Sequence, residues 1–183
     1  MTHEDDNSPI TVEPSLLYTA EITVSDSNGH SQKAYALFDT GAQHTLINTH
    51  GLHHLRFQTC QTQNRLRIGG VEGKNAILID KVITFSFLPK KKPYQQIKTQ
   101  GLLVPGIAQW AAASPTTIPQ WIQRYKGSLA DERLASGTKQ LPFDIIFDHA
   151  TSKWLLGKFY GRKDKDGFCV EHTLFGIFVT GRS

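Results

Sequence analysis

A chain of 183 residues is long enough for one domain with a substantial hydrophobic core, and its two cysteines exclude a disulfide framework. A formal charge of +4, with one run of lysines at positions 90–92, is small for a protein that binds nucleic acid, so nucleic acid is not an expected partner. No apolar stretch is long enough to cross a membrane, and no membrane contact is expected.

The N-terminal part of the chain predicts a tail followed by a β-hairpin. Residues 1–15 are mostly polar and acidic, and we expect them to form a flexible tail ahead of a domain over residues 16–183. Residues 17–24 and 33–38 are rich in β-branched, aromatic and apolar side chains. Between them, Asn28-Gly29 is a strong signal for a tight turn. The returning strand of this hairpin ends at Phe38.

An apolar run leads directly into Asp39-Thr40-Gly41, and apolar residues return at Leu46 and Ile47. This pattern predicts a buried strand that ends in a tight loop, with a carboxylate at the edge of the core. Thr40 offers a hydroxyl that can fix the loop, and Gly41 allows close approach because it has no Cβ. A carboxylate costs free energy in apolar surroundings, which favours a functional role. The alternative interpretation is an ordinary Asp-Thr-Gly turn after a strand.

The middle of the chain predicts a second hairpin. Residues 66–68 and 76–87 have the composition of strands, and three glycines lie at the tip between them. A further strand is expected at 101–104. Histidines at 50, 53 and 54, taken with Cys60, do not have the spacing of a zinc site, so neither a metal nor another cofactor is expected.

Residues of about 106–140 are predicted to form an insertion, which holds Trp110, Trp121 and Tyr125. These aromatic side chains either present a surface to a partner or pack the insertion onto the core. A short helix is predicted at 118–125, because Pro119 lies where the first turn would begin.

The C-terminal part predicts a buried strand at 141–147 and a helix at 148–157. Asp148 is expected to be the N-cap, and Ala150, Trp154 and Leu155 fall on one face. A charged turn is expected at 161–167, and a single final strand at 172–181. The predicted fold class is therefore mainly β with one short C-terminal helix.

Four segments in this order resemble a known protein family. Four segments, Asp-Thr-Gly-Ala-Gln at 39–43, Leu-Ala-Asp at 129–131, Phe-Asp-Ile-Ile at 143–146 and Thr-Leu-Phe-Gly-Ile-Phe-Val-Thr-Gly at 173–181, are similar to the retropepsin-like aspartic protease of BEL/Pao-type LTR retrotransposon polyproteins. The glycine-rich tip near 68–73 also resembles the flap of such proteases. The resemblance covers residues 17–181, and Ile177 stands where the family usually has tryptophan.

The resemblance implies a closed β-barrel, one half of an acid-protease fold, and an aspartic endopeptidase that cleaves extended polypeptide such as a retroelement polyprotein. It implies a cytoplasmic location, including retroelement particles. Asp39, Thr40 and Gly41 would form the catalytic loop, and a second copy must supply the other aspartate, so a homodimer is expected. Residues 174–179 and 10–16 are the expected interface. The residues that would bind substrate are Ala42, Gln43, Ile68, Gly69, Gly70 and Val71.

Phe147 departs from the family pattern, because retropepsins usually carry glycine at this place before the last helix. A phenylalanine there needs space or a shifted backbone. The alternative function is therefore a catalytically impaired or domesticated module that dimerises and binds peptide without cleaving it.

Overall fold

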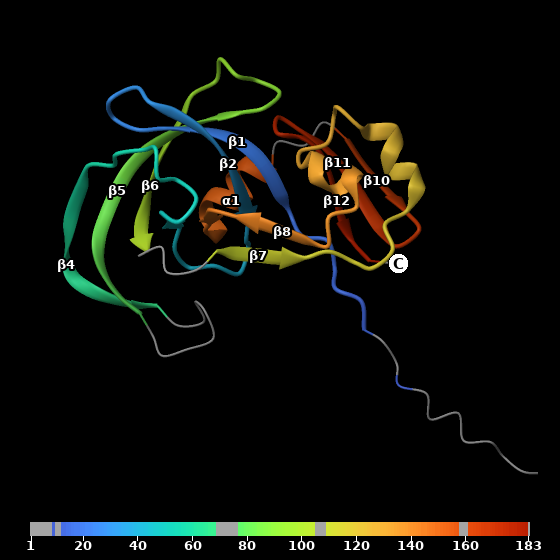
Figure 1. Ribbon diagram of the computed structural model, residues 1–183, viewed down its shortest axis with the longest axis horizontal. Coiled ribbons are helices and arrows are strands. Elements are labelled where there is room, and N and C mark those ends of the chain that lie inside the picture. Colours follow the sequence, from blue (N-terminus) through green and yellow to red (C-terminus); the bar gives the residue numbers. More distant parts are fainter. Residues whose placement is uncertain (1–8, 10–11, 69–76, 105–108, 158–160, 183) are drawn as a thin grey trace, which may run out of the picture.

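The computed structural model describes residues 9, 12–68, 77–104, 109–157 and 161–182 (Figure 1). The glycine-rich tip predicted near 68–73, apart from Ile68, and most of the predicted tail lie outside these residues. The described part is mainly β, and it contains one α-helix and two short 3-10 helices. None of the described helices has the length and apolar character needed to span a bilayer.

The largest sheet closes into a barrel. Its strand order is β1-β2-β9-β3-β6-β5-β4, and β1 also pairs with β5, so six strands form a closed ring and β4 extends from β5. This arrangement confirms the prediction of a mainly β chain with a closed β-barrel. The strands are β1 (Thr19–Ser25), β2 (Ser31–Phe38), β3 (Leu46–Asn48), β4 (Thr59–Ile68), β5 (Ile77–Pro89), β6 (Ile97–Val104) and β9 (Ile145–Phe147).

The barrel interior is filled by side chains that alternate along the strands. Ile83, Phe85 and Phe87 of β5 are buried, whereas the residues between them are more exposed. Such alternation is what a strand with one buried face requires. Each fully buried side chain of this size contributes roughly 1.5–3 kcal/mol to the stability of the fold, because its apolar surface is removed from water. The first hairpin forms as predicted, with Thr19 paired to Leu37.

A second layer packs beside the barrel. It contains a three-stranded sheet, which lies to the right of the barrel in Figure 1, a two-stranded sheet and two 3-10 helices. Trp110 is buried in the cluster that joins this layer to the barrel, and Trp121 and Tyr125 pack against it. The insertion therefore packs its aromatic side chains onto the core. The elements are β7 (Trp110–Ala113), η1 (Gln120–Tyr125), η2 (Glu132–Ser136), β8 (Gln140–Phe143), β10 (Gly161–Lys165), β11 (Phe168–Thr173) and β12 (Gly176–Gly181).

The prediction of a single strand at 141–147 is wrong, because the segment divides at Asp144 into two strands, β8 and β9. Pro142 lies in the two-stranded sheet. A central strand of the barrel would need a backbone N–H at this position, and proline has none. At the division, the backbone of Asp144 donates to Tyr35 and accepts from Asn48. These two hydrogen bonds hold the chain where it passes from one sheet to the other.

The predictions for 161–167 and 172–181 also need correction. Residues 161–165 form β10, and the turn that follows is limited to Asp166 and Gly167, both with positive φ. The final strand is two strands, β11 and β12, separated by a tight turn. There the Thr173 hydroxyl donates to Gly176 O and accepts from the N–H of Phe175. Turn chemistry therefore interrupts a run that is apolar enough to resemble one strand.

The last strand is enclosed by its own chain. β11 pairs with one edge of β12, while Ser128 and Ala130 hydrogen-bond to Ile177 on the other side. Further along, Leu16 and Gly181 exchange two backbone hydrogen bonds. Side chains at 176–180 are buried. The strand over 174–179 is therefore already enclosed within one copy and is not free to pair with a second copy as predicted. The predicted contribution of residues 10–16 stays a prediction, because residues 10 and 11 lie outside the described residues and Val12 is exposed.

The helix α1 (His149–Leu156) follows β9, and Asp148 is its N-cap as predicted, accepting a hydrogen bond from Thr151 N. Its buried residues are Ser152, Leu155 and Leu156. The predicted apolar face is wrong in part, because Ala150 and Trp154 are exposed. The direction in which the helix leaves β9, rather than the hydropathy of its residues, decides which face packs on the barrel.

Candidate active site

The Asp39 loop lies where the barrel topology forces a crossing. Residues 39–45 connect β2 to β3, and β9 lies between those two strands, parallel to β2 and antiparallel to β3. A direct turn from β2 to β3 is blocked by β9, so the loop must pass over the end of β9 at which α1 begins. This topology places the Asp-Thr-Gly triplet beside Asp148 and His149, which are more than 100 residues away in the sequence.

Backbone hydrogen bonds attach the loop at both ends. Asp39 N donates to Phe147 O at 3.1 Å, and His149 N donates to Ala42 O at 2.8 Å. Within the loop, Ala42 N donates to Asp39 O at 3.2 Å. The loop is therefore fixed to the junction between β9 and α1, and its conformation does not depend on side chains alone.

Two side chains add to this attachment. The Thr45 hydroxyl accepts a hydrogen bond from Asp148 N at 3.1 Å. The ring Nδ1 of His149 lies 2.6 Å from Thr40 O. Thr45 is buried, whereas His149 and Thr40 are exposed. The loop is thus tied on its core side by threonine and on its solvent side by histidine.

The Asp39 carboxylate is partly exposed at this edge of the barrel. Its Oδ1 accepts a hydrogen bond from Gly41 N at 2.8 Å. A Cβ at position 41 would come within 3.2 Å of the same oxygen, so glycine leaves room for the carboxylate. Thr40 and Gly41 are exposed, and they can meet another molecule beside Asp39.

The predicted site residues fall into two groups. Asp39, Thr40, Gly41, Ala42 and Gln43 are brought together in one loop, with Gln43 exposed and Ala42 half-buried. Ile68 belongs to a different element, the end of β4, where its half-buried side chain packs on the second cluster. The other three predicted substrate-binding residues, Gly69, Gly70 and Val71, lie outside the described residues.

A pocket of about 170 Å³ adjoins the loop. Its lining includes His44 and Thr45 from the loop, Asp148 from the start of α1, and Val82 and Gln100 from the barrel. The two barrel residues also line a larger hollow of about 500 Å³. The candidate site therefore continues as a depression along the outside of β5 and β6.

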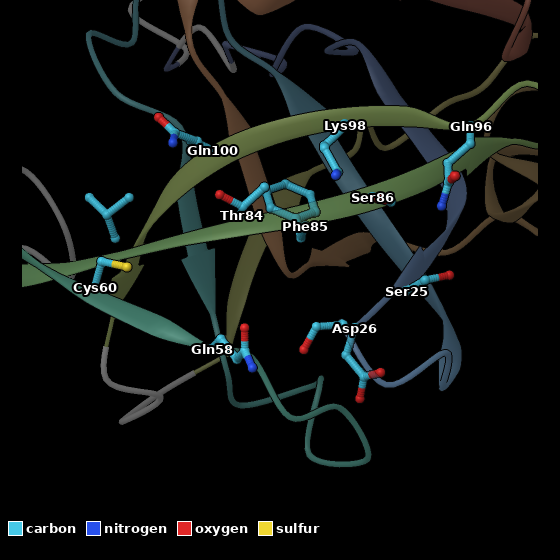
Figure 2. A pocket seen from close by; sticks show the side chains of 12 residues that line it. Ser25, Asp26, Gln58, Cys60, Thr84, Phe85, Ser86, Gln96, Lys98 and Gln100 are labelled. Carbon is cyan, nitrogen blue, oxygen red and sulfur yellow. The ribbon is translucent and has the colours of Figure 1, made fainter.

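Most of the residues that line the larger hollow are of polar type (Figure 2). It lies where β4 and β1 separate along the same edge of β5, since β4 pairs with β5 up to Ile83 and β1 pairs from Ser86. Figure 2 shows Gln58 and Cys60 at one side and Ser25 and Asp26 at the other, below Thr84, Gln96, Lys98 and Gln100. Its surface therefore offers hydroxyl, amide, amine and thiol groups to solvent.

Two carboxyl groups with shifted pKa values lie away from the loop. Burial alone would raise the pKa of Asp26, but backbone N–H groups of Arg56, His30 and Asn28 donate to this carboxylate and lower its pKa overall. Burial raises the pKa of Asp144, and a weak hydrogen bond from the backbone opposes the shift only in part. Both groups hold loops to strands, which is a structural role.

Phe147 is accommodated without disturbing the loop. Its side chain is fully buried in the barrel, with ring centroids 5.1 Å from Phe38 and 5.0 Å from Phe87. Its backbone oxygen still accepts the hydrogen bond from Asp39 N. The space that a phenylalanine needs is available inside the barrel, where the same cluster contains four small residues, Ala20, Ala34, Ala36 and Ala130.

His149 was not predicted from the sequence as part of the site. A single histidine next to a helix N-cap has no pattern that would assign it to a loop more than 100 residues earlier. Within the described ranges, no group of three or more His, Cys, Asp or Glu side chains is placed to hold a metal ion.

Comparison with known proteins identifies no relative. No family profile, no curated protein and no solved structure matches the chain. Function is therefore inferred from the sequence motifs and from the geometry of the site.

Proposed function

We propose that the chain is a retropepsin-like aspartic endopeptidase of the BEL/Pao type, which acts as a homodimer on extended polypeptide such as a retroelement polyprotein. The observation that carries the proposal is the Asp39 loop. It has the Asp-Thr-Gly sequence, it is hydrogen-bonded to the end of β9, and it presents a carboxylate partly exposed at the edge of a closed barrel. The resemblance of four ordered motifs supports the same assignment.

The chain supplies half of the required chemistry. Peptide hydrolysis by aspartates needs two carboxylates about 3 Å apart that share one proton. Asp39 is the single aspartate of an Asp-(Thr/Ser)-Gly triplet in the sequence, so a second copy must contribute the other. A two-fold axis beside the exposed Thr40 and Gly41 would bring the two Asp39 carboxylates together.

In the proposed reaction, the ionised Asp39 accepts a proton from water, and the water oxygen bonds to the carbonyl carbon of the substrate. The protonated Asp39 of the second copy donates its proton to the carbonyl oxygen. Collapse of this intermediate breaks the C–N bond. The leaving nitrogen takes the proton that the first Asp39 accepted from water, and one hydroxyl of the intermediate returns its proton to the second Asp39, which restores the dyad. No other reactant is consumed, because one water is divided between the two products.

The hairpin of β4 and β5 is the candidate flap in this proposal. Such a flap would cover an extended peptide, which would pair through its backbone and place alternate side chains in pockets. The small pocket next to His44 and Asp148 is suited to one such side chain.

The test compares cleavage of a denatured protein between about pH 4 and 7, where a dyad is expected to hold one proton. Asp39→Asn should lower the rate by orders of magnitude, because it removes the ionisable group from both copies. Asp166→Asn is the matched control. Asp166 is exposed, lies in a turn with φ of 52°, and asparagine tolerates that conformation.

Sedimentation at micromolar concentration should show a dimer that dissociates on dilution. Cleavage by a strictly monomeric chain would refute the shared site, and so would an Asn variant as active as the unmutated protein. A folded dimer without any cleavage would instead favour the alternative, a module that binds peptide and does not cut it.

A further inference from the structure

His149 touches the candidate catalytic loop on both sides of Gly41. Its backbone N–H donates to Ala42 O, and its ring Nδ1 lies 2.6 Å from Thr40 O. A carbonyl oxygen has no proton to give, so Nδ1 must carry the proton of this hydrogen bond. The contact therefore fixes the tautomer of the ring whenever the imidazole is neutral.

The contact matters because Thr40 O and Gly41 N belong to the same peptide unit. The unit is planar and trans, so its C=O and N–H point in opposite directions. At one end, the C=O accepts from the His149 ring. At the other end, the N–H donates to Oδ1 of Asp39 at 2.8 Å. Holding the carbonyl therefore also aims the N–H at the carboxylate.

Besides these two hydrogen bonds, the peptide unit is held by the turn that Ala42 N closes by donating to Asp39 O. Thr40 and Gly41 are exposed, and glycine resists rotation of its backbone less than any other residue. A hydrogen bond to the carbonyl also polarises the peptide, which strengthens the donor at its other end. Loss of the ring would leave the Gly41 N–H free to turn away from Asp39.

We propose that His149 is a positioning residue for Asp39, which it orients through the Thr40–Gly41 peptide. This inference rests on the proposed function only where it concerns catalysis, because the contact itself can be measured in an inactive protein. The role differs from that of a surface residue that stabilises the fold, since its loss should change the Gly41 amide and the turnover rate more than the melting temperature.

Three variants test the role. His149→Ala removes the ring. His149→Asn places an amide nitrogen at the same number of bonds from Cα as Nδ1, so it can replace the donor. His172→Ala is the control, because His172 is also an exposed histidine but lies on β11, away from the loop. Thermal melting of each variant checks that the fold is retained.

Amide exchange followed by NMR gives the readout that does not need activity. Gly41 N–H should exchange about tenfold faster in His149→Ala, return close to the unmutated rate in His149→Asn, and stay unchanged in His172→Ala. Nitrogen shifts of the neutral His149 ring should place its proton on Nδ1. Unchanged Gly41 exchange in a folded His149→Ala variant would overturn the proposal, whether or not the protein cleaves peptide.

Peptide cleavage gives the second readout. In His149→Ala, kcat should fall about tenfold with KM within about twofold, because the lost interaction orients the carboxylate rather than the substrate. His149→Asn should recover most of kcat. Equal loss in both variants would overturn positioning through the donor. If the unmutated protein cleaves nothing while Gly41 responds as expected, the proposed function fails and the orientation of Asp39 by His149 stands.

Discussion

Replacing Phe147 with glycine, the residue that the family pattern has there, should destabilise the protein strongly rather than repair it. The Phe147 side chain is fully buried and packs between the rings of Phe38 and Phe87. Truncating a buried phenylalanine to alanine costs about 3–5 kcal/mol. Glycine in a strand adds about 0.5–1 kcal/mol through backbone entropy. The expected loss in the free energy of unfolding is therefore about 3.5–6 kcal/mol.

Such a loss is comparable to the whole stability of many domains, which is about 5–15 kcal/mol. Urea titration followed by circular dichroism should show a much lower midpoint for Phe147→Gly, with an unchanged slope if unfolding remains two-state. Phe147→Leu is the matched control, and it should cost less than about 2 kcal/mol because most of the buried volume is kept. A loss below about 1.5 kcal/mol for the glycine variant would refute the packing described for this residue.

Three further substitutions test other features of the fold. Burial raises the pKa of Asp144, so the contribution of this carboxyl group to stability is present below its ordinary pKa and is lost as pH rises through the raised pKa. In thermal melts between about pH 3 and 7, the stability of Asp144→Asn relative to the unmutated protein should therefore increase as pH rises. Asp148→Ala removes the N-cap of α1 and should cost about 1 kcal/mol in urea titration, and no measurable loss would contradict the cap. Gly176→Ala should cost at least about 2 kcal/mol more than Gly29→Ala. Both glycines have positive φ, but only a Cβ at position 176 would meet a neighbour, because it would lie 2.7 Å from the backbone oxygen of Ser128. Equal costs for the two substitutions would contradict this close approach.

Features that depend on neighbours along the chain could be predicted from the amino-acid sequence. The first hairpin followed from its strand composition and from Asn28-Gly29, and the start of α1 followed from Asp148, because turns and caps are made by residues a few positions apart. The strand that ends at Phe38, just before Asp39, was likewise predicted from an apolar run followed by a turn triplet. The candidate site was thus located by a local pattern.

The tertiary structure decided everything that depends on pairing between distant segments. It placed β9 between β2 and β3, which gave the Asp39 loop its partner His149, 109 residues beyond Thr40. It enclosed β12 within its own chain and turned Phe147 into the barrel. Hydropathy alone could not separate these outcomes, because an apolar residue is equally compatible with any buried surface. The choice among those surfaces is made by which strands pair, and strand pairing is a property of the whole chain.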